Sequence, residues 1–235
     1  MSAAEDGSPK NLWGPGTTHW SVLLSPDSPG DAWRFFYERY RDSVSALLRR
    51  GGVAEAELED LVQEFFTATL QREFLAKADP SRGRFRGYLC TAARRFLASH
   101  YRRSGRLKRQ PDAGLVALDS TVAATVPAGG VTPEDEFDLA WARAVLQRAV
   151  ARAEQAYRAQ DKPGHAEAFR LRQLGTGWQE VATRLGTTQG AVRGWVSRFE
   201  QQVADHLREE VAGTVASEAD LEAELRALSE ILSRS

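Results

Sequence analysis

The stretch from Trp178 to Ser197 constrains the fold most, because its residue pattern is typical of a helix-turn-helix. Val181, Ala182 and Leu185 recur at helical spacing. Gly186 follows them, where the end of a helix favours a left-handed residue. A small side chain at Ala182 lets two helices cross closely. We therefore expect a short helix, a tight turn and a second helix within this stretch.

The second helix of the pair is predicted from a cap and an apolar stripe. Thr187 or Thr188 is a suitable N-cap. The apolar positions that would face back into a core are Val192, Trp195, Val196 and Phe199. In a helix-turn-helix the second helix lies in the major groove, so this pattern predicts a protein that binds double-stranded DNA.

The candidate contacts of this second helix divide by chemistry. Arginine donates two hydrogen bonds to guanine and glutamine pairs with the edge of adenine, so we expect Gln189 and Arg193 to contact bases. Thr187 and Thr188, at the helix N-terminus, suit phosphate contacts. The remaining candidates on the outward face and its rim are Ser197 and Arg198. The alternative interpretation is an ordinary helical hairpin inside a core.

Charge is distributed unevenly along the 235 residues, although the net charge is only −1. Ten arginines or lysines and no acids lie between Pro80 and Pro111, whereas seven acids and two bases lie between Glu55 and Asp79. With 42% hydrophobic residues the chain has enough apolar side chains for one large or two small domains. The segregation of charge predicts two surfaces with different partners.

Helical periodicity dominates the chain and strand signals are weak, so we expect an all-α protein with two small helical domains joined by a flexible linker. Helices are expected over about 33–48, 55–76 and 84–103, and again from Thr132 through a short helix at 165–174 and the helix-turn-helix to about Glu210. The expected parts are an irregular arm (1–30), a first domain (31–104), a linker (105–131), a second domain (132–212) and an amphipathic tail helix (213–235).

The predicted third helix of the first domain mixes basic and aromatic residues. Arginines neutralise phosphates, and flat rings stack on unpaired bases, so the pattern favours single-stranded or melting DNA. The alternative is a solvated basic face over core aromatics. The candidate residues are Arg84, Arg86, Tyr88, Arg94, Arg95, His100, Tyr101, Arg102 and Arg103.

The predicted second helix carries an acidic side. Its apolar residues turn inward, and the exposed set is Glu59, Asp60, Gln63 and Glu64. Such a face is common on any helix that contacts water. Its position directly before a basic, aromatic helix favours a docking surface for a basic protein partner.

These three segments together resemble a sigma factor of bacterial RNA polymerase, of the minimal extracytoplasmic-function kind. Residues 60–66 match the family pattern D-x-x-Q-E-x-F, and residues 85–95 match F-R-x-W/Y-L-x-x-x-A-R-R/N. The resemblance covers about 31–104 and 132–210. The N-terminal arm and the leucine-rich tail lie outside the minimal pattern. The predicted recognition helix also carries two glycines, Gly190 and Gly194.

The resemblance implies a function and partners. The 60–66 segment would dock on core RNA polymerase. The 85–95 helix would melt the minus-ten promoter element, and the helix-turn-helix would bind the minus-thirty-five element. The implied partners are core polymerase, promoter DNA and an anti-sigma factor or other regulator, with no membrane and no cofactor. A cytoplasmic location follows from these partners and from the lack of a signal-like apolar segment.

Three other functions stay open at the level of sequence. A free-standing transcriptional regulator would dimerise through Leu221, Leu225, Leu228 and Leu232. An adaptor would bind proteins and no DNA. An enzyme is disfavoured, because the four histidines are scattered and Cys90, the single cysteine, lies in an apolar helix. No metal site is expected.

Overall fold

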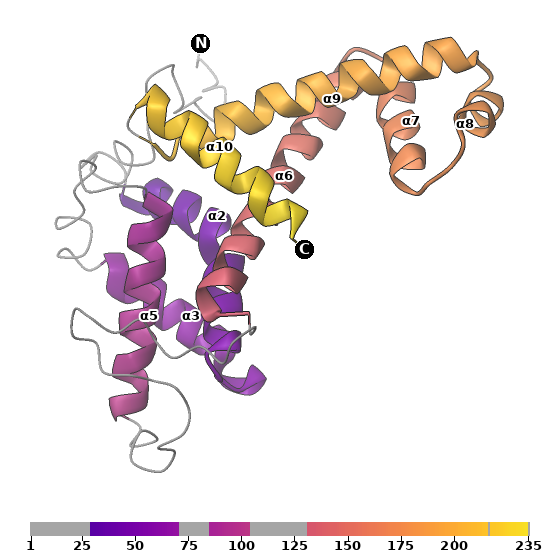
Figure 1. The fold of residues 1–235 in the computed structure, drawn as a ribbon. Coiled ribbons are helices and arrows are strands. Elements are labelled where there is room, and N and C mark those ends of the chain that lie inside the picture. Colours follow the sequence, from indigo (N-terminus) through magenta and orange to yellow (C-terminus); the bar gives the residue numbers. More distant parts are fainter. Residues whose placement is uncertain (1–28, 71–84, 104–130, 216, 235) are drawn as a thin grey trace, which may run out of the picture.

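The computed structural model describes residues 29–70, 85–103, 131–215 and 217–234, and within these ranges the chain forms eight helices and no strand. The all-α prediction is confirmed (Figure 1). The helices are α2 (Pro29–Arg50), α3 (Glu55–Leu70), α5 (Phe85–Arg103), α6 (Pro133–Ala159), α7 (Gly164–Gln173), α8 (Trp178–Arg184), α9 (Gln189–Ala212) and α10 (Glu218–Ser233). The end of the expected 55–76 helix, from residue 71 on, lies outside the described residues, and so does the expected linker except for Val131.

Side-chain caps fix where α6 and α10 begin. At α6 the backbone N–H of Asp135 donates to Oγ1 of Thr132 at 3.0 Å, and the N–H of Thr132 donates to the Asp135 carboxylate at 2.9 Å. Pro133 occupies the first helical position, where its missing N–H costs nothing. At α10 the N–H of Asp220 donates to the hydroxyl of Ser217 at 3.2 Å. The cap predicted at Thr132 is confirmed.

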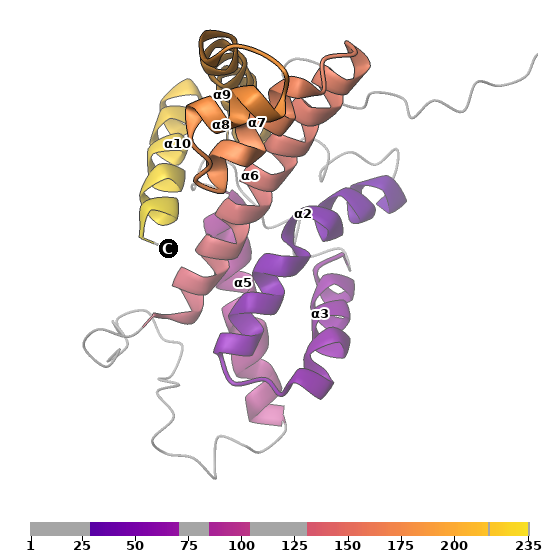
Figure 2. The same cartoon turned by 90° about the vertical axis from the view of Figure 1, so that its right-hand side faces the viewer.

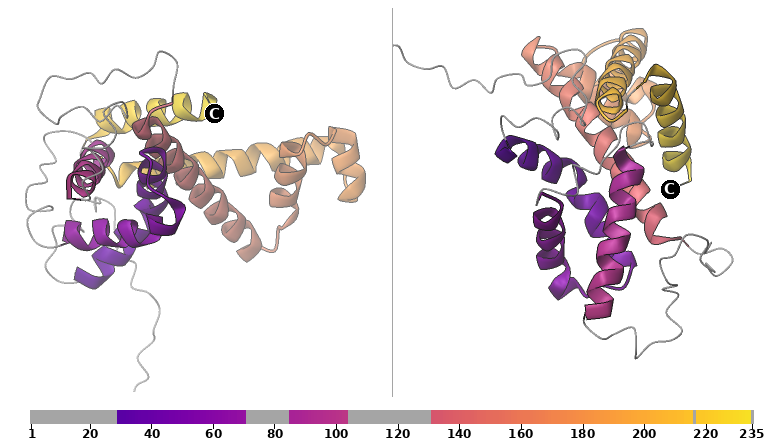
Figure 3. Two further views of the ribbon diagram at one scale, coloured as in Figure 1. Left: turned by 90° about the horizontal axis from the view of Figure 1, so that it is seen from below. Right: turned by 90° about the vertical axis from the view of Figure 1, so that its left-hand side faces the viewer.

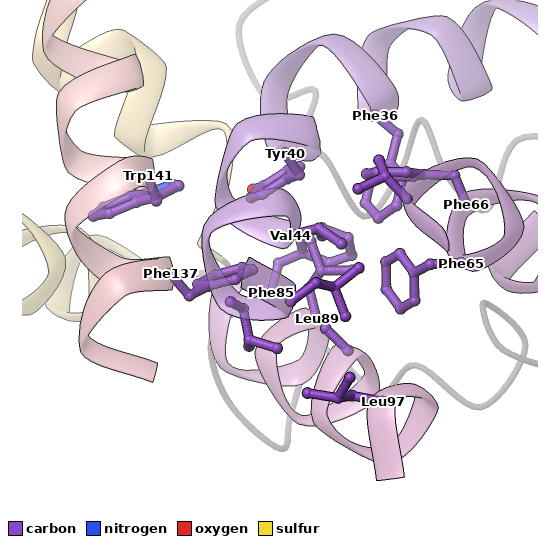
Figure 4. Close-up of a cluster of buried hydrophobic side chains, with 14 of the residues drawn as sticks. Phe36, Tyr40, Val44, Phe65, Phe66, Phe85, Leu89, Leu97, Phe137 and Trp141 are labelled. Carbon is purple, nitrogen blue, oxygen red and sulfur yellow. The ribbon is translucent and has the colours of Figure 1, made fainter. Parts of the chain in front are cut away.

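Helices α2, α3 and α5 bury a core of aromatic and aliphatic side chains (Figure 4). The ring of Phe36 lies 5.6 Å from that of Phe66 and 5.2 Å from that of Phe85, both in edge-to-face arrangements. Such pairs stabilise a fold beyond the apolar area that they bury. Buried leucines and valines such as Val44 and Leu89 fill the space between the helices.

Helix α6 completes this same core, although the sequence assigns it to the second domain. It packs against α2 and buries Phe137, Trp141 and Val145 among the side chains of the first bundle. Helix α10 contributes the buried Leu221 and Leu228 from the C-terminal end. The main core therefore contains residues from both sides of the expected linker.

Helix α9 begins in the helix-turn-helix and ends at this core (Figures 1 and 2). Along the way it packs on α6, where Phe199 and Val203 meet Ala149, Ala153 and Tyr157. Figures 1 and 3 show α8 at the end of the molecule opposite α3 and α5. No helix in the described part of the chain combines the length and the apolar character that a membrane span requires.

His165 at the start of α7 lies between two aromatic rings. Its imidazole stacks on Tyr157 at 4.5 Å and on Trp195 at 5.3 Å between ring centroids. Burial, with the positive charge of Arg198 as a second cause, lowers the pKa of His165 from its ordinary value of 6.5. The folded protein therefore holds this ring neutral to lower pH than the unfolded chain does.

We expect this histidine to make the free energy of unfolding decrease on mild acidification. As pH falls below 6.5, His165 of the unfolded chain takes up a proton before His165 of the folded protein does. The contribution of this residue to the free energy of unfolding is therefore complete above 6.5 and decreases between 6.5 and the lowered pKa of the folded state. His165→Phe keeps an aromatic ring between Tyr157 and Trp195 but cannot take up a proton, so the free energy of unfolding should change less with pH in this variant. Urea unfolding between pH 7.5 and 5 compares the two proteins, and equal slopes in both would contradict the assignment.

Candidate nucleic-acid and polymerase interfaces

The helix-turn-helix predicted from the sequence is present. Val181 and Ala182 of α8 are buried against Val192 and Val196 of α9, with α7 covering the same small core. Gly186, in the turn between α8 and α9, has φ of +63°, which is the left-handed conformation expected of it. The turn is closed by a hydrogen bond from the Thr187 N–H to the carbonyl of Ala182 at 2.9 Å.

The cap and the outward face of α9 follow the predicted pattern. Of the two candidate threonines, Thr188 is the N-cap, and its hydroxyl accepts from the N–H of Ala191 at 3.2 Å. Thr187 is half-buried, whereas the other candidates are exposed: Thr188, Gln189, Arg193, Ser197 and Arg198. A Cβ added at Gly190 would meet no atom within 4 Å, so its backbone is open to close approach by a ligand.

The Arg193 guanidinium does not extend freely from the helix. Its central carbon lies 4.9 Å from the centroid of the Trp178 ring, and that of Arg172 lies 4.0 Å from the same ring. Cation–π contact of this kind restrains a long side chain while leaving its hydrogen-bond donors available. Trp178, at the first position of α8, therefore positions Arg193 at the exposed surface.

On α5 the candidate residues divide into exposed and buried groups. Arg94, Arg95, Arg102 and Arg103 are exposed, and Tyr88 and His100 are half-buried. Arg94 pairs with Glu134 at 2.5 Å and Arg103 with Glu64 at 3.0 Å. Arg95 and Arg102 make no ion pair within the described residues, so theirs are the charges most open to a phosphate. Arg84 lies outside the described residues.

Arg86 and Tyr101, unlike the other described candidates of α5, are buried in this arrangement. The Tyr101 hydroxyl donates to the carbonyl of Gly51 at 2.9 Å, which ties α5 to the end of α2. Arg86 is paired with Glu224 of α10 and with Asp138 of α6. The sequence pattern missed these partners because they lie far along the chain from α5.

The acidic face of α3 is exposed as expected. Glu59 accepts from Arg41 at 2.5 Å and from the Tyr37 hydroxyl at 3.1 Å, and the bond from Arg41 lowers the pKa of its carboxyl. Glu64 is engaged by Arg103, as described above. Asp60 makes no ion pair within the described residues, and the exposed Gln63 lies one turn beyond Glu59. Asp60 is thus the carboxylate of this face that is most available to a partner.

The described residues contain no group of three or more histidine, cysteine or acidic side chains able to hold a metal ion. Cys90 is half-buried on α5, and burial raises the pKa of its thiol to about 12. A thiol with such a pKa is mostly protonated at neutral pH and is a poor nucleophile. The interpretation of Cys90 as a small packing residue is consistent with this environment.

Comparison with known protein families finds a match, which lies in the first half of the chain. Residues 36–107 match the family model described as Sigma-70 region 2. The match spans less than half of the chain and contains α3, α5 and most of α2. No curated protein and no solved structure matched the chain.

The protein therefore carries a Sigma-70 region 2 domain, which supports its assignment as a sigma-70 family sigma factor. Such a domain implies binding to core RNA polymerase and to promoter DNA. Both the acidic face of α3 and the basic side chains of α5 lie within the matched residues.

Proposed function

We propose that this protein is a sigma factor of the extracytoplasmic-function kind, which binds core RNA polymerase, recognises the minus-ten and minus-thirty-five promoter elements and promotes transcription initiation. The observation that carries the proposal is the combination of the Sigma-70 region 2 match with a separate helix-turn-helix on α8 and α9. A cytoplasmic location, where polymerase works, belongs to the same proposal.

Attachment to polymerase is assigned to the exposed side of α3. Asp60 and Gln63 are accessible there, while the opposite side of the helix is fixed in the core by Leu61, Phe65 and Phe66. A face held rigidly by a packed core presents its carboxylate at a defined position, which favours specific docking on a basic surface.

Promoter contact is divided between two places. On α9, Gln189 and Arg193 would hydrogen-bond to base edges of duplex DNA, with Thr188 at the helix N-terminus near a phosphate. On α5, Arg95 and Arg102 would neutralise phosphates, while the partly exposed rings of Tyr88 and His100 would stack on bases as the strands separate. The protein would thereby lower the cost of opening the duplex and would perform no bond chemistry itself.

The main competing function is a dimeric repressor joined through the leucine face of α10. Leu221 and Leu228 are buried against this chain's own core, so that face is occupied in the present arrangement. A pull-down with core RNA polymerase separates the two functions. Retention of the protein by core enzyme supports the sigma factor, whereas a shift of duplex DNA without any retention by core enzyme supports the repressor.

Control by an anti-sigma protein is an added part of the proposal. Such a protein would have to cover the exposed side of α3 or the exposed arginines of α5, since these are the surfaces assigned to polymerase and promoter. Co-purification of a partner that competes with core enzyme would identify it.

Arg193→Ala is expected to weaken promoter binding by about 1–3 kcal/mol in a base-dependent manner. The reason is loss of a bidentate contact to a base from an exposed guanidinium that Trp178 holds in place. Competition binding with promoters that differ at single minus-thirty-five positions measures the effect. Arg226→Ala, an exposed arginine on α10, is the matched control. Equal loss on every sequence would assign Arg193 to the DNA backbone instead.

A further inference from the structure

A buried ion pair joins α5 to the C-terminal helix. Nε and Nη2 of Arg86 donate to the two carboxylate oxygens of Glu224 at 2.8 and 3.2 Å. The remaining nitrogen pairs with Asp138, and the guanidinium lies 4.6 Å from the centroid of the Trp141 ring. The Glu224 side chain is fully buried, and Arg86 is 8% exposed. Two of the guanidinium nitrogens of Arg86 are thus bound by a carboxylate that belongs to α10.

The rest of α10 packs through one apolar face, on which Leu225, Ile231 and Leu232 lie against the core beside the buried leucines. Its apolar stripe places Leu221 and Leu228 in the core, while the outer side forms exposed ion pairs from Arg208 to Glu218 and Glu222. Exposed pairs of this kind add little stability. Helix α10 packs on α6 and α9, whereas α8 packs on α7 and α9, so the small core of the helix-turn-helix does not depend on α10.

The chemistry of the pair suits an interface that opens. Two charges lose their hydration on burial, and their attraction repays only part of that cost. When α10 leaves, both charges regain water, so separation is less unfavourable than for an apolar contact of similar size. The planar guanidinium donates two hydrogen bonds to a carboxylate or to a phosphate in the same geometry. The two nitrogens of Arg86 that donate to Glu224 therefore suit a phosphate equally well.

We propose that α10 is an autoinhibitory cover, in which Glu224 blocks Arg86 until α10 is displaced and a phosphodiester of promoter DNA takes its place. The proposal rests on the assignment of α5 to promoter binding. In the covered state α5 presents only its outer arginines. In the open state Arg86 is added to the same helix, at its N-terminal end.

Glu224→Gln is the direct test, because it removes the charge and keeps the size of the side chain. Arg86 stays paired with Asp138 in this variant, so no buried charge is left without a partner. Amide hydrogen exchange of residues 218–233 should become at least about tenfold faster, while exchange in α2 stays unchanged as evidence of an intact core. Glu222→Gln removes the same formal charge from the exposed side and should leave α10 protected.

A second measurement on the same three proteins tests the link to DNA. A fluorescein-labelled single-stranded oligodeoxynucleotide, titrated by anisotropy, should bind Glu224→Gln at least about threefold more tightly than the parent or Glu222→Gln. Unchanged exchange in α10 would overturn the cover. Faster exchange with an affinity equal to that of Glu222→Gln would overturn the role of Arg86. Failure of the sigma assignment itself would appear separately, as absence of binding to core polymerase by all three proteins.

Discussion

Asp60→Lys is expected to lower the affinity for core RNA polymerase by at least about a hundredfold, since like charges placed together at an interface cost several kcal/mol. Asp60 is exposed on α3 and makes no ion pair within the described residues, so the change acts on the partner and not on the fold. The thermal unfolding temperature should therefore stay the same. Immobilised core enzyme and increasing concentrations of the protein measure the affinity.

The control for this reversal is Glu230→Lys on α10. Glu230 is also exposed, and its carboxylate forms a long ion pair with Arg234 at 3.7 Å. The same change in net charge should leave core binding intact there. Equal affinities of Asp60→Lys and the parent for core enzyme would remove the acidic face of α3 from the docking surface.

Trp141→Ala is expected to lower the free energy of unfolding by about 3–5 kcal/mol. Trp141 is 1% exposed on α6, within the core that α2, α3 and α5 form, and its ring also contacts the guanidinium of Arg86. Truncation leaves a large cavity and weakens the environment of a buried charge. Urea unfolding followed by circular dichroism gives the change in free energy.

This second result tests whether α6 belongs to the main core. If α6 packs in the main core, Trp141→Ala lowers the free energy of unfolding of α2, α3 and α5 together with that of α6. Leu174→Ala serves as the control, since Leu174 is 71% exposed and its loss should change stability by less than about 0.5 kcal/mol. A loss below about 1 kcal/mol for Trp141→Ala would indicate that α6 is separate from that core.

Local patterns predicted the helices well because the determining interactions are local. The cap at Thr132 involves Asp135 three residues later, and the left-handed turn at Gly186 depends on the residue itself. The buried face of α9 follows from side chains that recur along one helix, such as Val192 and Val196. Each of these features is contained within one turn or one short stretch of sequence.

Pairing across the chain was not predictable in the same way. The α5 segment has no acid nearby in sequence, yet Arg86, Arg94 and Arg103 all meet carboxylates in the folded chain. Their partners are brought in by helix packing, which spacing along α5 does not encode. One signal did exist for the tail: Glu224 lies three residues after Leu221, on the apolar stripe of α10. A carboxylate buried at such a position is unfavourable unless a cation pairs with it, so the sequence indicates a buried basic partner for Glu224.

The expected division at 105–131 shows the same limit. Composition marks a polar segment well, but it does not determine where the following helix packs. Phe137 and Trp141 lie just after that segment, and they are buried with Tyr40 of α2. The position of a helix in space is fixed by matching apolar faces, which here connect α6 back to α2.

The most direct test of the sigma factor assignment is run-off transcription with purified core RNA polymerase on a library of genomic promoters. We expect the protein to direct core enzyme to a limited set of templates that share upstream and downstream elements, and we expect core enzyme alone to produce none of these transcripts. Transcripts that are identical with and without the protein, despite binding of the protein to duplex DNA, would contradict the assignment.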